Sequence, residues 1–147
     1  MSNKEYIKGI LWCNNKEINI HCDKFIKLKN IMNKKRIDIN NHGDELFKST
    51  IKNVLNNFKD IDYKVIANLE NISVSIVEQE FELIKEFITI FKNNNTPFEC
   101  ELINVPYSFD TIWSLITPLL SKEALKIVKI RKNESYMDSF FNIIGYD

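Results

Sequence analysis

The residues from Ser75 to Phe91 restrict the fold of this chain more than any other segment. Ser75 and Glu78 have the spacing of a capping box, in which the serine hydroxyl accepts from a free backbone amide, so we predict that a helix begins near Ser75. A helix that is apolar over most of its circumference must be covered on more than one side. Its apolar side chains recur at helical spacing and form a broad face: Ile76, Val77, Phe81, Leu83, Ile84, Phe87, Ile88, Ile90 and Phe91.

Strand and helix patterns alternate along the whole chain. Consecutive strands joined by helices become parallel through right-handed crossovers, and 147 residues suffice for one sizeable core. We therefore predict a single domain over residues 1–147, an α/β fold with one mixed, mainly parallel sheet of about five strands flanked by helices. The predicted strands are 5–12, 17–22, 60–70, 100–105 and 126–131, and the other predicted helical segments are 23–32, 44–58, 108–120 and 135–144.

The composition excludes several classes of function. The 20 basic and 20 acidic residues cancel, so no long-range field attracts nucleic acid, and we expect no nucleic-acid partner. The longest apolar runs, about six residues, are far below the length of a membrane span, and the first five residues contain no secretory signal. A soluble, cytoplasmic protein is therefore expected. Three glycines in the chain leave no dinucleotide-binding fingerprint and no P-loop.

Neither the cysteines nor any catalytic motif indicates a disulfide-bonded protein or an enzyme. Cys13, Cys22 and Cys100 are odd in number and widely spaced, which favours buried free thiols over a disulfide framework. His21 beside Cys22 leaves a metal site as an alternative, but a zinc site needs further ligands that the sequence does not provide nearby. Because no nucleophile–base pair, metal cluster or phosphate loop is evident, we expect neither an enzyme nor a cofactor.

The segment from Glu99 to Ile130 contains the most distinctive motifs. A strand over residues 100–105 stops at Pro106, and Ser108 can cap the helix that follows. Large apolar stripes usually belong to a protein core, so core packing stays an alternative to a functional role. The side chains along one face of this predicted helix are Phe109, Ile112, Trp113, Ile116, Leu119 and Leu120.

These motifs resemble those of the CRAL-TRIO lipid-binding domain family. That family has a strand ending in I-N-A-P, an aromatic start to the next helix, an I-W pair, a P-F-L segment and a basic residue entering the last strand. The counterparts are Ile103-Asn104-Val105-Pro106, Phe109, Ile112-Trp113, Pro118-Leu119-Leu120 and Lys126-Ile127-Val128. Upstream, the segment 68–73 resembles the family's D-L-K-G-I-S, with Asn68 and Asn71 replacing Asp and Gly. Without counterparts of the family's N-terminal helical domain and L-P-x-x-F-G-G segment, the chain is expected to be a minimal or divergent member.

The resemblance implies a lipid pocket closed by a movable helix. In the family, the helix after the N-A-P motif acts as a gate over an apolar pocket that holds one lipid, here phosphatidylinositol or another phospholipid. A mobile gate would also give transient contact with a membrane surface. The implied gate or pocket-wall residues are Tyr107, Phe109, Ile112, Trp113, Ile116, Leu119 and Leu120.

Head-group contacts are implied at four further positions. Glu99, which follows Pro97, and Lys126 are the nearest counterparts of a Glu and a Lys that some phosphatidylinositol-binding members use. Ser73 and Ser75 match positions near a choline head group, although helix capping already accounts for Ser75. The alternative for Glu99 and Lys126 is a role as solvated surface charges.

A protein-interaction module is the alternative function. Some divergent members of the family bind proteins, small GTPases among them, and truncated ends would favour surfaces over a cavity. An apolar face left without its terminal segments would also make a homodimer reasonable.

Overall fold

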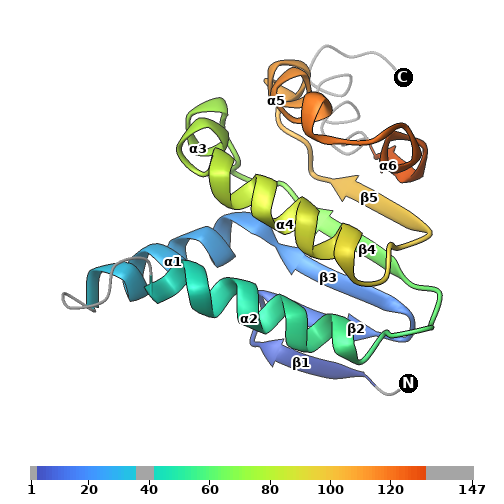
Figure 1. Ribbon diagram of the computed structural model, residues 1–147. Coiled ribbons are helices and arrows are strands. Elements are labelled where there is room, and N and C mark those ends of the chain that lie inside the picture. The colour runs from blue at the N-terminus through green and yellow to red at the C-terminus, as the bar shows by residue number, and fades with distance from the viewer. Residues whose placement is uncertain (1–2, 36–41, 132–147) are drawn as a thin grey trace, which may run out of the picture.

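A six-stranded sheet, whose strands lie in the same order as in the chain, forms the base of the structure (Figure 1). The structure is a computed structural model, which describes residues 3–35 and 42–131. The first two strand pairs are antiparallel and the other three are parallel, which confirms the mixed, mainly parallel sheet. The strands are β1 (Lys4–Ile7), β2 (Leu11–Asn14), β3 (Glu17–His21), β4 (Lys64–Asn68), β5 (Glu99–Ile103) and β6 (Val128–Ile130).

Strands β2 and β3 form an antiparallel β-hairpin. Its tight turn places Asn15 at φ +57°, a left-handed conformation that asparagine tolerates better than most residues. Ile18 and Ile20 are both buried on one face of the sheet, as alternation along a strand requires. The segment predicted as one strand over residues 5–12 is instead divided between β1 and β2, which raises the strand number from about five to six.

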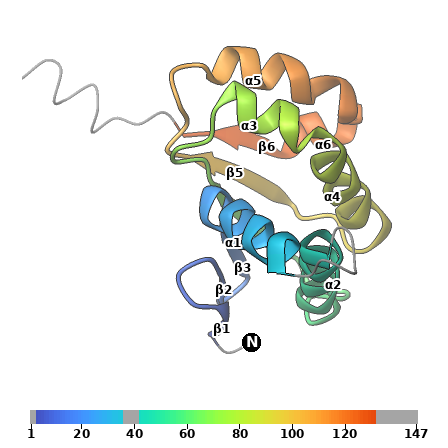
Figure 2. The same ribbon diagram turned by 90° about the vertical axis from the view of Figure 1, so that its left-hand side faces the viewer.

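The helices gather over one face of the sheet (Figure 2). Because each parallel strand lies next to its predecessor, right-handed crossovers carry the connecting helices over the same side. Strand β4, which lies within the segment predicted as a strand over residues 60–70, is covered by the described helices on one face. On its other face, Ile66 is only half-buried. The helices are α1 (Cys22–Lys35), α2 (His42–Asn56), α3 (Val74–Gln79), α4 (Phe81–Asn93), α5 (Phe109–Ile116), the 3-10 helix η1 (Thr117–Leu119) and α6 (Lys122–Ile127).

The prediction of a single helix that begins near Ser75 is wrong, because two helices, α3 and α4, occupy this segment. The chain leaves helical geometry at Glu80, which ends α3 and begins α4 with φ −102° and ψ 16°. The capping residue is Ser73, whose hydroxyl accepts a hydrogen bond from the Ile76 amide at 3.2 Å. Ser73 has the extended backbone that an N-cap needs, whereas Ser75 already lies inside the first turn of α3.

The C-terminal strand is shorter than predicted. Lys126 and Ile127 belong to α6 rather than to a strand, and only residues 128–130 form β6. The Ser121 hydroxyl, which accepts from the Ala124 amide at 3.1 Å, caps this short helix. The helix predicted over residues 135–144 lies outside the described residues. Within them, no helix is both long and apolar enough to cross a membrane.

Asn95 joins two loops at one end of the sheet. Its side-chain amide donates to the backbone carbonyls of Phe58 at 2.7 Å and Ile61 at 2.8 Å. The hydroxyl of Tyr63, which is fully buried, donates to the Asn95 carbonyl. The connection between α2 and β4 is therefore tied to the connection between α4 and β5, although 32 residues or more separate the partners.

We predict that Asn95→Ala lowers the free energy of unfolding by about 1–3 kcal/mol, because it removes the side-chain donor from the Ile61 carbonyl and leaves the Phe58 carbonyl with the Ile61 amide alone. Urea unfolding followed by circular dichroism measures the change. Asn93→Ala is the control, since Asn93 is exposed at the end of α4. Equal stability of the two variants would contradict the assigned role of Asn95.

Candidate functional site

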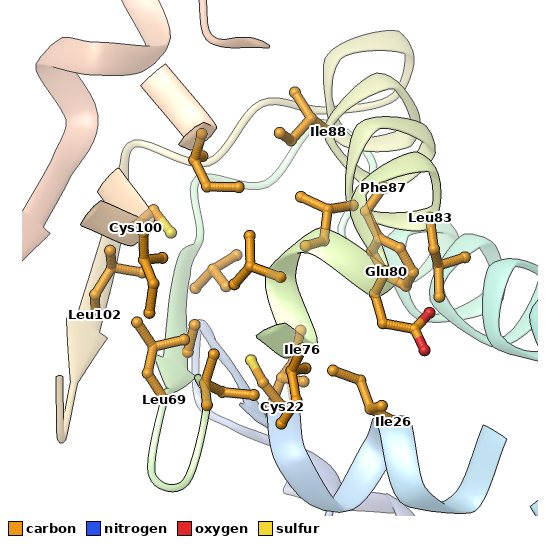
Figure 3. A pocket seen from close by; sticks show the side chains of 18 of the residues that line it. Cys22, Ile26, Leu69, Ile76, Glu80, Leu83, Phe87, Ile88, Cys100 and Leu102 are labelled. Atoms are coloured by element: carbon orange, nitrogen blue, oxygen red, sulfur yellow. The ribbon is translucent and has the colours of Figure 1, made fainter. Parts of the chain in front are cut away.

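A cavity of about 310 Å³ lies between the sheet and the helices (Figure 3). Its floor is formed by side chains of four neighbouring strands, and helices α1 to α5 contribute its walls. The volume is at the lower end of the range for small-molecule sites, about 300–1,000 Å³. The floor residues are Ile20, Val65, Ala67, Cys100, Leu102 and Val128, and the walls include Ile26, Phe47, Ile76, Leu83, Ile84, Phe87, Ile88, Ile112 and Trp113.

The apolar floor follows from strand alternation. Val65 and Ala67 of β4 pair with Cys100 and Leu102 of β5, so their side chains point to the same side. The residues between them, such as Glu101, point to the other side of the sheet. Part of the wall comes from the broad apolar face that the sequence predicts over residues 75–91, which is divided between α3 and α4.

Helix α5 contributes the wall that the sequence predicts as a gate. Phe109 and Ile112 are buried, and the rings of Phe109 and Trp113 stack with their centroids 5.8 Å apart. Five of the seven predicted gate or wall residues line the cavity: Phe109, Ile112, Trp113, Ile116 and Leu120.

The other two predicted wall residues do not line the cavity. Tyr107 precedes α5 and is 82% exposed. Leu119 lies in η1, because α5 ends at Ile116 and Pro118 begins a tighter turn that takes Leu119 off the apolar face. The prediction of a continuous helical face through residue 120 was therefore wrong at its end.

None of the four predicted head-group residues lines the cavity. Glu99 alternates with Cys100 and points to the opposite face of the sheet, where its carboxylate lies 3.0 Å from Lys64 Nζ. Lys126 is exposed in the last turn of α6, and Ser75 is exposed in α3. Ser73 is engaged as the cap of α3.

The two asparagines that depart from the family pattern have clear structural roles. Asn71 has φ +65°, a conformation that suits glycine and, among other residues, asparagine. The Asn104 side-chain amide donates to Asn68 Oδ1 at 3.2 Å, and the same oxygen accepts from the Glu70 amide at 3.0 Å. The two recognised motifs thus meet where β4 and β5 end.

Among the cavity residues that the sequence did not identify, three carry a thiol or a carboxylate. Cys22 and Cys100 border the cavity from α1 and β5, and burial raises the pKa of Cys22 to about 12 and that of Cys100 to about 11. Glu80 is the third, and it is the only charged residue among the described residues that line the cavity. The sequence does not predict Glu80 at the cavity, because in a single continuous helix it would lie on the polar surface, whereas it lies between α3 and α4.

His21 forms contacts other than those of a metal ligand. Its Nδ1 accepts from the Lys24 amide at 3.4 Å, and its Nε2 lies 3.6 Å from Glu70 Oε2. Within residues 3–35 and 42–131, no group of three or more His, Cys, Asp or Glu side chains could hold a metal ion.

Comparison with models of protein families gives a match over most of the chain. A family model described as the CRAL/TRIO domain matches residues 46–144. The matched region includes β4, β5 and β6 together with helices α3 to α6, and therefore most of the cavity. The comparison with curated proteins found no match.

We predict that Cys22 and Cys100 react slowly with iodoacetamide at pH 8. Their raised pKa values keep them protonated, so alkylation should be at least about a hundredfold slower than in urea. The folded rate should keep rising up to pH 10, because thiolate grows about tenfold per pH unit below the pKa.

Two variants that each retain a single thiol provide the Cys22 signal and its control: C13S/C100S retains Cys22 and C22S/C100S retains Cys13. An apolar ligand should protect Cys22 and leave Cys13 unaffected, since Cys13 does not line the cavity. A Cys22 rate at pH 8 equal to the unfolded rate would contradict the assigned burial.

Proposed function

Because the chain belongs to the CRAL/TRIO domain family, a family of lipid-binding domains, we propose that its cavity binds one lipid and that the protein transfers it between membranes. The observation that carries this proposal is the apolar cavity beneath α5, whose walls offer aliphatic and aromatic side chains to a ligand. Each CH₂ group that moves from water into such a site contributes about 0.8 kcal/mol. We propose phosphatidylinositol or another phospholipid as the ligand, bound without chemical reaction or cofactor.

We further propose that α5 moves to admit the lipid. Ile112 of α5 packs with Ile72 and Val77 in a small cluster that is distinct from the main core around Phe58 and Tyr63. Displacement of α5 would therefore break few contacts of the main core. Segments that bind ligands commonly belong to such less stable parts of a structure.

Movement of α5 would bring the protein into transient contact with a membrane. Trp113 and Ile116 line the cavity from α5 and would become accessible when the helix moves. Tyr107, exposed just before α5, is suited to the interface because tyrosine combines an apolar ring with a polar hydroxyl. We accordingly propose a cytoplasmic protein that associates peripherally with membranes.

We predict that the purified protein extracts phosphatidylinositol from vesicles and that Trp113→Asp lowers the amount retained at least about tenfold, because the change puts a charge into an apolar wall. Native mass spectrometry of the protein after incubation with vesicles measures the complex. Leu125→Asp is the control, since Leu125 is exposed on α6 and does not line the cavity.

The wild-type result decides the proposal. A protein that retains no lipid in the spectra and transfers none between vesicles would contradict it. Capture of a purified protein partner that is unaffected by Trp113→Asp would favour the protein-interaction module instead.

We propose a homodimer as the form in solution that would cover remaining apolar surface. Light scattering should then give twice the chain mass of 17.4 kDa. A mass of 17.4 kDa at the concentrations used for lipid binding would contradict the dimer and leave the lipid proposal intact.

A further inference from the structure

The cavity offers a ligand only hydrocarbon and thiol groups. No polar atom of the described lining residues contributes to its surface. Glu80 is no exception, because its carboxylate pairs with Lys29 and only its aliphatic carbons border the cavity. Figure 3 shows its two oxygens turned away from Cys100 and Leu102 of the floor. A polar group that entered such a cavity would lose its water and find no partner.

The volume limits how much hydrocarbon the cavity can hold. A cavity of about 150 Å³ lined by aliphatic and aromatic side chains holds one benzene molecule, which has six carbons. The cavity of this protein, about 310 Å³, has twice that volume and on the same scale holds about twelve carbons. A whole phospholipid, with its head group and two acyl chains, is far larger. The cavity therefore fits one end of a single chain.

Ala67 sets the depth of the cavity at the middle of its floor. In the register of the sheet it lies between Ile20 of β3 and Leu102 of β5, which also line the cavity. Alternation along β4 directs its side chain to the same side as theirs. It is the smallest of the described lining side chains. A larger side chain at this position would fill space that a ligand can use.

We propose that the cavity takes the methyl end of one hydrocarbon chain, to a limit of about twelve carbons, and that Ala67 sets this limit. The head group and any second chain of the lipid stay outside the cavity, which accordingly selects chain length and not head group. The proposal rests on the lipid-binding function proposed above and names the part of the lipid that the cavity recognises.

The test of the length limit uses lysophosphatidylcholines, which have one acyl chain, with eight, ten, twelve and fourteen carbons. Isothermal titration calorimetry with the full chain, below the micelle concentration, measures their affinities. Each CH₂ that leaves water should tighten binding about fourfold, so each step of two carbons should tighten it about fifteenfold. Above twelve carbons the cavity is full, and the step to fourteen should give less than about threefold.

The test of the head group keeps the chain at twelve carbons. Lysolipids with phosphocholine, phosphoinositol and phosphoglycerol head groups should differ from one another by less than about threefold. One hydrogen bond between a head group and a charged side chain would give more than about tenfold. No such bond is expected, since the cavity surface is apolar.

Two variants should move the limit in opposite directions. Ala67→Leu adds three carbons to the floor, so the step from ten to twelve carbons should fall below about threefold. Leu102→Ala removes three carbons beside Ala67, so the step from twelve to fourteen should rise to about fifteenfold. Ala124→Leu is the matched control and should keep the wild-type limit, because Ala124 lies on α6 and does not line the cavity. Leu102→Ala tests the proposal even if Ala67→Leu does not fold.

Three outcomes would overturn the proposal and leave lipid binding intact. They are an affinity that still rises about fifteenfold from twelve to fourteen carbons in the wild type, a difference of about tenfold or more between head groups, and an unchanged limit in both Ala67→Leu and Leu102→Ala. Failure of every lysolipid to bind would also overturn it. The proposed function falls as well only if native mass spectrometry shows no phospholipid retained from vesicles.

Discussion

The packing of helices α1 to α5 over one face of the sheet is the constraint on which the rest of the described structure depends. Parallel strands β3 to β6 follow one another in chain order, so each crossover returns over the same side. That side must be apolar over its whole width, and alternation sends the polar residues of the same strands to the other side. The cavity and the charged surface are thus two results of one topology.

The opposite face of the sheet contains a network of charges. Glu101 is 7% exposed in its side chain, and its carboxylate pairs with Lys64 and Arg131. Lys64 also pairs with Glu99 at 3.0 Å. A buried carboxylate is tolerable only when cations satisfy it. Glu99, which the family resemblance implied as a head-group contact, therefore belongs to an ion-pair network on the face of the sheet opposite the cavity.

The cavity exists because the helices on this face belong to two packing units. Phe25, Phe47 and Leu83 belong to the main core, whereas Ile72, Val77 and Ile112 form the smaller cluster under α5. The change of direction at Glu80 lets α3 pack towards α5 while α4 packs towards α2. Lys29 joins this point to α1, so the charged pair lies where the two units and the cavity meet.

The sequence by itself determined several of the elements and the motifs that mark the family. Periodicity located α2, β4, β5 and α5 to within a few residues, because alternation and helical spacing are local properties. The segments around Asn68 and Asn104 marked the family for the same reason. Only the tertiary structure decided which face of β5 meets the cavity, and thereby removed Glu99 from it. It also brought Lys29 to Glu80, 51 residues away, and Cys22 and Cys100 to one cavity. No local pattern records such encounters, because they depend on how strands and helices far apart in the chain pack together.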